Sequence, residues 1–122
     1  MLLLAIGIKM LDDEARFLWF ERNGTNYTRA QFYLFSGEKE RAFSVKENED
    51  VRIEWNPQLK KGRLVLTVEA PGGVPGSSSD GVIRTEGADI FSFSAREKGQ
   101  VKLHMKGQEA QGSFEVRWST EE

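Results

Sequence analysis

Apolar and polar residues alternate with a period of two along most of this chain. The clearest run extends from Gly62 to Ala70 and is followed directly by the turn-forming residues Pro71, Gly72 and Gly73. The same alternation recurs at Val51–Trp55, Phe91–Ala95, Val101–Met105 and Phe114–Trp118. A strand that buries one face and exposes the other has this period. The pattern therefore predicts antiparallel β-sheets with one face in a core and one face in water.

Clusters of glycine, proline and polar residues interrupt the alternation and divide the chain into about eight predicted strands. The predicted breaks are 23–24, 36–39, 46–49, 56–61, 71–81, 96–99 and 107–111. Short strands at a spacing of roughly a dozen residues are typical of β-sandwiches and barrels. We therefore predict an all-β domain over 15–119 with the fold of an antiparallel, jelly-roll-like β-sandwich.

Three of these breaks have a composition that indicates how the chain turns. Asn23–Gly24 favours a two-residue hairpin turn of type I′, in which both central residues take a positive φ. Pro57 is expected to end the strand before it, because proline cannot donate a hydrogen bond to a sheet. The stretch Pro71–Gly81 consists mostly of glycine, proline and serine, and predicts a loop that buries little surface.

Residues 1–14 are predicted to form a separate apolar segment. Its apolar run, Met1–Ile8, is ended by Lys9 and the acidic cluster Asp12–Glu14. The run is shorter than the ~20 residues that a membrane-spanning helix needs, so no membrane span is predicted. It lacks a preceding basic region and a following cleavage site of small residues. Three interpretations remain: a buried first strand or short helix, a truncated signal or anchor, or a segment that docks on a partner.

Composition excludes several classes of function. The 122 residues carry a net charge of -2, which gives no electrostatic basis for binding nucleic acid. The chain contains no cysteine, so disulfides, thiolate zinc sites and a cysteine nucleophile are all ruled out.

Titratable and glycine-rich clusters predict no catalytic, metal or cofactor site. His104 is the only histidine, and the alternation places it on an outward face beside Lys102 and Lys106. A general base needs a partner that orients it, and no neighbour in the sequence supplies one, although the fold could. The acidic clusters Asp12–Glu14 and Glu47–Asp50 lack the residue spacing of a calcium loop. No phosphate-binding motif follows the glycine-rich loop.

Aromatic residues supply the candidate binding surface. Trp55 and Trp118 fall in phase with the apolar faces of their strands and are predicted to be core residues. By contrast, the segments that contain Trp19 and Tyr33 are apolar on both faces, so each is either buried on both sides or exposes a patch for a partner. We therefore predict a binding surface formed by Trp19, Tyr27 and Tyr33.

An ordered series of strand and turn sequences resembles known domains. The series is Phe43–Val45, Gly62–Leu66, Ala70–Gly73, Phe91–Ala95 and Gly99–Val101. It resembles Golgi-dynamics-like and bacterial pre-peptidase C-terminal-like β-sandwich domains. The ending Ala110–Trp118, with Asn23–Ala30 before a Ser36–Gly37 turn, is similar to small bacterial secreted or lipid-anchored proteins of uncharacterised function. The resemblance implies a bacterial protein at the cell surface or outside the cell.

These observations favour a non-catalytic binding or interaction module with a protein or carbohydrate partner. An alternative is a homo-oligomeric structural protein in which N-terminal strands pair or swap between chains. The two alternatives differ in whether the N-terminal segment determines the oligomeric state.

Overall fold

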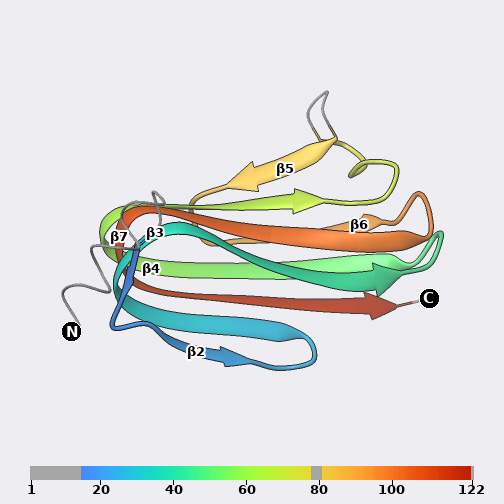
Figure 1. Ribbon diagram of the computed structural model, residues 1–122. Coiled ribbons are helices and arrows are strands. Elements are labelled where there is room, and N and C mark those ends of the chain that lie inside the picture. Colours follow the sequence, from blue (N-terminus) through green and yellow to red (C-terminus); the bar gives the residue numbers. More distant parts are fainter. Residues whose placement is uncertain (1–14, 78–80, 122) are drawn as a thin grey trace.

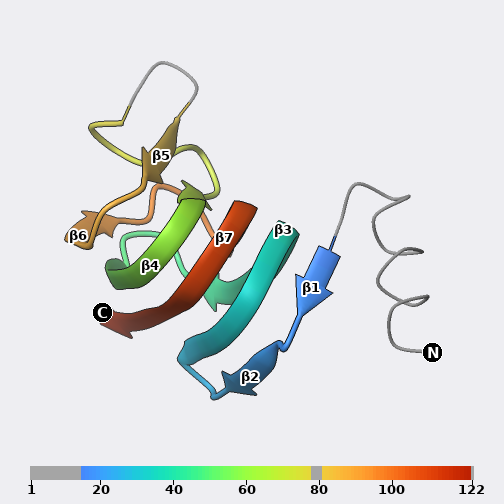
Figure 2. The same ribbon diagram turned by 90° about the vertical axis from the view of Figure 1, so that its left-hand side faces the viewer.

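The protein is a seven-stranded, antiparallel all-β structure over the residues that the computed structural model describes, 15–77 and 81–121 (Figure 1, Figure 2). The strands are β1 (Ala15–Phe17), β2 (Phe20–Asn23), β3 (Tyr27–Val45), β4 (Asp50–Glu69), β5 (Val82–Thr85), β6 (Asp89–Ser94) and β7 (Gly99–Glu121). The predicted fold class is therefore confirmed, with seven strands where about eight were expected. The predicted N-terminal segment 1–14 and residues 78–80 of the serine-rich loop lie outside the described residues.

Three long strands, β3, β4 and β7, each bend and take part in both layers of the sandwich (Figure 1). In one layer, Arg117 of β7 pairs with Tyr27 of β3 and with Glu54 of β4. In the other layer, Lys106 of β7 pairs with Glu38 and Val65 of the same two strands. The fold is thus a long antiparallel sheet folded over on itself.

We name the two layers by their strands. The first sheet contains β1, β2, the first half of β3, the second half of β7, the first half of β4, and β6. The second sheet contains the second half of β3, the first half of β7, the second half of β4, and β5. Every described pairing is antiparallel, which matches the one-sided alternation in the sequence.

Three breaks that were predicted as turns are bends inside these long strands. The breaks at 36–39, 56–61 and 107–111 lie within β3, β4 and β7. The pairing register shifts there, between Phe32 and Gly37 in β3 and between Leu59 and Arg63 in β4. Bulges use the same glycine and polar residues as tight turns, because both need unusual backbone angles. The sequence therefore located the changes of direction correctly and predicted the wrong structure for them.

Pro57 was also expected to end a strand, and instead it lies inside β4, opposite Phe114 of β7. The neighbouring strand β6 pairs with β4 only as far as Trp55, opposite Asp89. From that point β4 has an open edge on this side, where a missing N–H breaks no ladder.

The hairpin predicted at Asn23–Gly24 connects β2 and β3, but its turn differs from the prediction. Gly24 N donates to the carbonyl oxygen of Tyr27 at 2.9 Å, so the turn spans Gly24 to Tyr27. Neither Asn23 nor Gly24 takes the positive φ of a type I′ turn. The polar residues Thr25 and Asn26 lengthen the connection, which removes the need for that backbone conformation.

The core lies between the two sheets and is built by the inward half of each alternating strand. Trp55 and Trp118 are 1% and 5% exposed, which confirms both as core residues. Phe114 packs against Trp55 with ring centroids 5.6 Å apart, and Phe43 stacks on Trp118 at 5.3 Å. Leu66 and Leu103 of the second sheet, both fully buried, belong to the same cluster. Burial of these large side chains supplies the main favourable term in folding.

Candidate functional site

The outer face of the first sheet carries a row of side chains that crosses four strands. Phe20 of β2 pairs with Gln31 of β3, Gln31 pairs with Ser113 of β7, and Ser113 pairs with Gln58 of β4. Directly paired residues point to the same face of a sheet. The row therefore places one aromatic ring, two amides and a hydroxyl side by side, over three strand spacings or ~14 Å.

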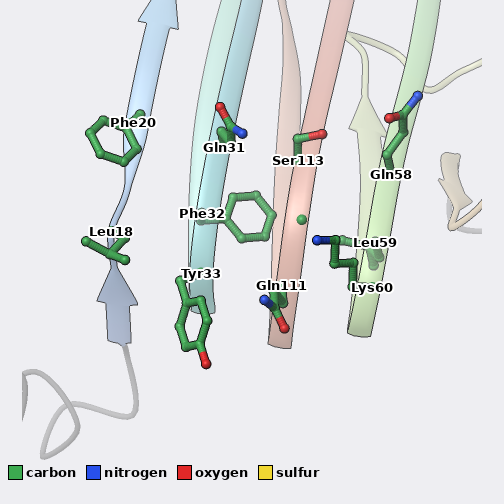
Figure 3. Close-up of a pocket in the computed structure, with 11 residues that line it drawn as sticks. Leu18, Phe20, Gln31, Phe32, Tyr33, Gln58, Leu59, Lys60, Gln111 and Ser113 are labelled. Carbon is green, nitrogen blue, oxygen red and sulfur yellow. The ribbon is translucent and has the colours of Figure 1, made fainter.

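A groove of about 550 Å³ lies along this row (Figure 3). Leu18, Phe20 and Tyr33 line one side, and Gln58, Lys60 and Gln111 line the other. A second hollow of about 290 Å³ shares Gln31, Gln58 and Ser113 with the groove and continues toward Arg29, Asn56 and Glu115. Together the two hollows form a depression that is elongated along β3, β7 and β4.

Gly112 of β7 forms part of the groove floor, where β4 approaches β7 closely. A Cβ at this position would lie 2.1 Å from the carbonyl oxygen of Gln58, and the φ of Gly112 is +144°. The register shifts of β3 and β4 flank this glycine. Bulges are often found next to binding sites because they redirect side chains, and here they lie beside Tyr33 and Lys60.

Three apolar side chains form an exposed wall on the β1–β2 side of the groove. Leu18, Phe20 and Tyr33 are 53%, 66% and 54% exposed. Tyr33 also contacts Phe17 edge to face, with ring centroids 5.8 Å apart, which limits how freely its ring can turn. Exposed rings that are held in one orientation are suited to stacking on a ligand.

The three glutamines that line the groove make no side-chain hydrogen bond to another described residue. They are Gln31, Gln58 and Gln111. Each amide offers two donor hydrogens and an acceptor oxygen. No described part of the chain satisfies these amide groups. The groove therefore presents hydrogen-bonding groups to solvent or to a ligand.

Inward-facing neighbours hold the apolar wall in place. The Trp19 ring lies 5.5 Å from the Phe32 ring and 4.8 Å from the Phe35 ring. Its Nε1 donates to Glu21 Oε1 at 2.8 Å, and Lys39 of the second sheet forms an ion pair with the same carboxylate. Because Trp19 and Glu21 point into the sandwich, Leu18 and Phe20 point outward.

The Glu21 carboxylate has a strongly shifted pKa. Its partial burial acts to raise the pKa, but the hydrogen bonds from Lys39, Asn23 and Trp19 outweigh that effect and lower it from 4.5 to about 2. The charged form of Glu21 is thus the one that the fold stabilises at neutral pH.

The structure places the three predicted site residues in different surroundings. Tyr33 lines the groove. Tyr27 lies on the same outer face, with the guanidinium groups of Arg29 and Arg117 at 5.7 Å and 5.3 Å from its ring. Trp19 packs against the core instead. These three residues therefore do not form one continuous platform.

Sequence reasoning missed Phe20 and the glutamines. Phe20 belongs to an apolar run in which both faces looked alike, so its phase could not be assigned. The glutamines come from three strands, and only the strand register brings them together.

Basic side chains border the groove. Lys60 extends from β4 toward β7 in Figure 3, and no described residue forms an ion pair with it. Arg22 of β2 stands directly opposite Arg29 of β3. Glu115 is shared by Arg29 and Arg117, at 3.8 Å and 2.7 Å.

His104 lies on the other side of the molecule, on the outer face of the second sheet. It alternates with Lys102 and Lys106 as predicted. Its Nδ1 is 2.7 Å from Glu38 and 3.2 Å from Glu40, and its Nε2 is 2.6 Å from Glu69. Within 15–77 and 81–121, no group of histidine and acidic residues is arranged to hold a metal ion.

Comparisons with known proteins find similar folds at low identity. No protein-family model and no curated protein matches the sequence. The periplasmic inhibitor PliG of g-type lysozyme from Aeromonas hydrophila is 13% identical, with a TM-score of 0.49 over 79% of this chain and 89% of that chain. A carbohydrate-binding module of Cellvibrio mixtus lichenase 5A, solved with cellotriose, is 15% identical, with a TM-score of 0.42 over 88% and 92%. A CBM4 structure is 6% identical, with a TM-score of 0.43 over 84% and 77%.

These values indicate no more than a general likeness among β-sandwich proteins. The β-sandwich that the resemblance in the sequence implied is present, and no family model supports an assignment to the Golgi-dynamics or pre-peptidase domains. No helix of the described residues is long and apolar enough to cross a membrane.

Proposed function

We propose that this chain is a non-catalytic carbohydrate-binding module, and that the groove on the outer face of the first sheet is its binding site. The observation that carries the proposal is the row in which Phe20 stands beside Gln31, Ser113 and Gln58. An aromatic face attracts the C–H groups on one side of a sugar ring, because the ring face is electron-rich. The amides and the hydroxyl match the donors and acceptors of the sugar hydroxyls.

The shape and polarity of the groove support a sugar chain over a protein partner. The exposed apolar wall consists of Leu18, Phe20 and Tyr33, and unpaired amides follow it immediately. A protein interface has an apolar centre surrounded by a polar rim. Here apolar and polar groups lie side by side along an elongated depression, which suits an extended polymer with hydroxyls along its length.

The chemistry of the groove supports binding without cleavage. Glycoside hydrolysis requires a pair of carboxyl groups that flank the scissile bond. Within the described part of the chain, no aspartate, glutamate or histidine lines the groove around Gly112, and the second hollow has a single carboxylate, Glu115, so the depression holds no carboxyl pair. His104 and its three glutamates lie on the outer face of the other sheet.

We also propose that the protein is located at the cell surface or outside the cell. Polysaccharides of cell walls and extracellular matrices are the ligands that an open groove of this kind would meet. The resemblance of the sequence to secreted and lipid-anchored bacterial proteins supports the same location.

A glycan array with matched variants tests the proposal. The array carries neutral oligosaccharides (gluco-, xylo-, manno- and chito-oligomers) and acidic ones (uronate-containing and sulfated). Tyr33→Ala removes a groove ring, whereas Ile90→Ala removes an equally exposed apolar side chain from outside the groove, at 55% exposure. Binding that Tyr33→Ala weakens roughly tenfold and Ile90→Ala leaves unchanged supports the proposal. Absence of binding to every glycan contradicts it.

The oligomeric state of this protein tests whether a second copy of the chain, in place of a sugar, covers the apolar wall. A second copy of this chain would bury Leu18, Phe20 and Tyr33 in place of a sugar. Sedimentation of the wild type should show a monomer. A dimer that Tyr33→Ala dissociates would contradict carbohydrate binding at this face and would favour the homo-oligomeric alternative.

A further inference from the structure

The groove is bordered by cations that lack enough carboxylate partners. Lys60 lines the groove, and no aspartate or glutamate lines it within the described part of the chain. Lys60 forms no ion pair with another described residue. A lysine that serves only solubility can point into bulk water, whereas this side chain extends over the groove toward β7 (Figure 3).

Arg22 and Arg29 form a second cationic position on the same face. They are direct cross-strand neighbours, and like charges directly opposite each other destabilise a sheet. Glu115 offsets only part of this repulsion, because it is 3.8 Å from Arg29 and is held more closely by Arg117 at 2.7 Å. Another carboxylate on this face, that of Glu54, is paired with Arg52 at 3.6 Å. A bound anion would relieve the repulsion between Arg22 and Arg29.

The two cationic positions are separated along the groove. Lys60 is on β4, and Arg29 is on β3, with β7 between them. Two strand spacings and about four residues along the strands separate them, on the order of 15–20 Å. The polar row of Gln31, Ser113 and Gln58 lies between the two positions. A ligand that contacts both positions therefore carries negative charges at intervals, with hydroxyls between them.

We propose that the groove takes an anionic glycan, with one acidic group at Lys60 and another between Arg22 and Arg29. The inference rests on the proposed carbohydrate-binding function and specifies its ligand class. Carboxylates of uronic acids and sulfate esters share the chemistry that the cations recognise. The net charge of the whole chain is -2, so this face attracts an anion through its local charge distribution.

The test compares charged glycans with their neutralised forms. Polygalacturonate oligomers and their carboxyl-reduced counterparts differ only in the acidic group, and chondroitin sulfate and its desulfated form examine sulfate in the same way. Calorimetry should show that a charged form binds at least tenfold more tightly than its neutral counterpart. Added salt should reduce this preference, because it screens exposed charges.

Charge-removing variants assign the preference to the groove. Lys60→Gln should weaken binding of the charged glycan by about three- to fivefold more than it weakens binding of the neutral form. Lys61→Gln removes the same charge from the adjacent residue, which does not line the groove, and should have no effect. Arg22→Gln should lower affinity for the charged glycan by a similar factor and raise thermal stability slightly, because it removes the repulsion with Arg29.

The outcomes separate this inference from the proposed function. Equal affinity for charged and neutral glycans, with Lys60→Gln and Lys61→Gln alike, would overturn the anionic preference and leave carbohydrate binding intact. Absence of binding to the charged glycans would overturn the inference, whereas the proposed function fails only if no glycan of the array binds. A smaller charge preference in Lys60→Gln and in Arg22→Gln, but not in Lys61→Gln, supports the inference.

Discussion

Gly112 of β7 lies so close to Gln58 of β4 that any side chain on the glycine would meet the backbone of its neighbour. A Cβ would be 2.1 Å from the Gln58 carbonyl oxygen and 2.8 Å from the Cα of Leu59. This contact brings β4 against β7 at the bend and leaves the groove floor without a side chain at this position. The bend and the candidate binding site are therefore parts of one local arrangement.

Gly112→Ala should destabilise the fold and distort the groove. The positive φ alone costs about 1–3 kcal/mol, and the contact with Gln58 adds to that cost. Chemical denaturation measures the difference in the free energy of unfolding. Gly76→Ala is the matched control, because Gly76 also has a positive φ but a Cβ there would meet nothing within 4 Å. Equal losses in the two variants would show that the close approach of β4 does not matter.

Glu21→Gln should lower stability at neutral pH and have no effect in strong acid. The pKa of Glu21 falls from 4.5 to about 2 on folding, so its charged form contributes stability that is complete above pH 4.5. That contribution is lost as the pH falls through about 2, where the carboxyl is protonated in both states. The Tm difference between variant and wild type, measured across this range, should shrink toward zero in acid.

Glu86→Gln is the control for this titration. The hydrogen bond from Arg63 lowers the pKa of Glu86, but the pair is at the surface and solvent screens it. Its Tm should change little at any pH. A Tm loss in Glu21→Gln that stays constant with pH would mean that the charge of Glu21 is not what stabilises the β2 edge.

Arg41→Lys should weaken the connection between the β2–β3 turn and the second sheet. Arg41 donates to Gly24 O at 3.0 Å and to Thr28 Oγ1 at 2.5 Å, and its guanidinium lies 5.1 Å from the Trp118 ring. Lysine cannot reproduce this planar fork of donors. A loss of about 1.5–3 kcal/mol in the free energy of unfolding is expected.

Arg52→Lys provides the comparison for Arg41. Arg52 is exposed and lies 3.6 Å from Glu54, so the same substitution should change stability by less than about 0.5 kcal/mol. If the two variants unfold at the same denaturant concentration, then the contacts of Arg41 do not hold the turn.

The alternation of residues was sufficient to predict the fold class and the buried tryptophans. Leu64, Leu66 and Val68 show why, since period-two burial is a local property that a sequence displays directly. The turns at the bends could not be predicted in the same way. Gly62 and Glu109 take positive φ inside continuous strands, and the sequence signal for such a bulge is the same as for a turn.

The candidate binding groove was only partly predictable. Tyr33, which lines it, was predicted as a site residue because its segment is apolar on both faces. Phe20 and Trp19 could not be distinguished, because neighbouring aromatic residues leave the phase of a strand undefined. Gln31 and Gln58 are 27 positions apart in the sequence, and they share the groove only because both flank Ser113 of β7. Register between distant strands depends on tertiary packing, which a single sequence does not show.

NMR titration of the ¹⁵N-labelled protein with the tightest-binding oligosaccharide of the array tests the central claim most directly. The largest changes in amide chemical shift should fall on the groove, at Gln31, Tyr33, Gln58, Gln111 and Ser113. Amides around Thr67 and His104 on the second sheet should stay unchanged. Changes centred on the second sheet, or no change at all with every glycan tested, would contradict the account.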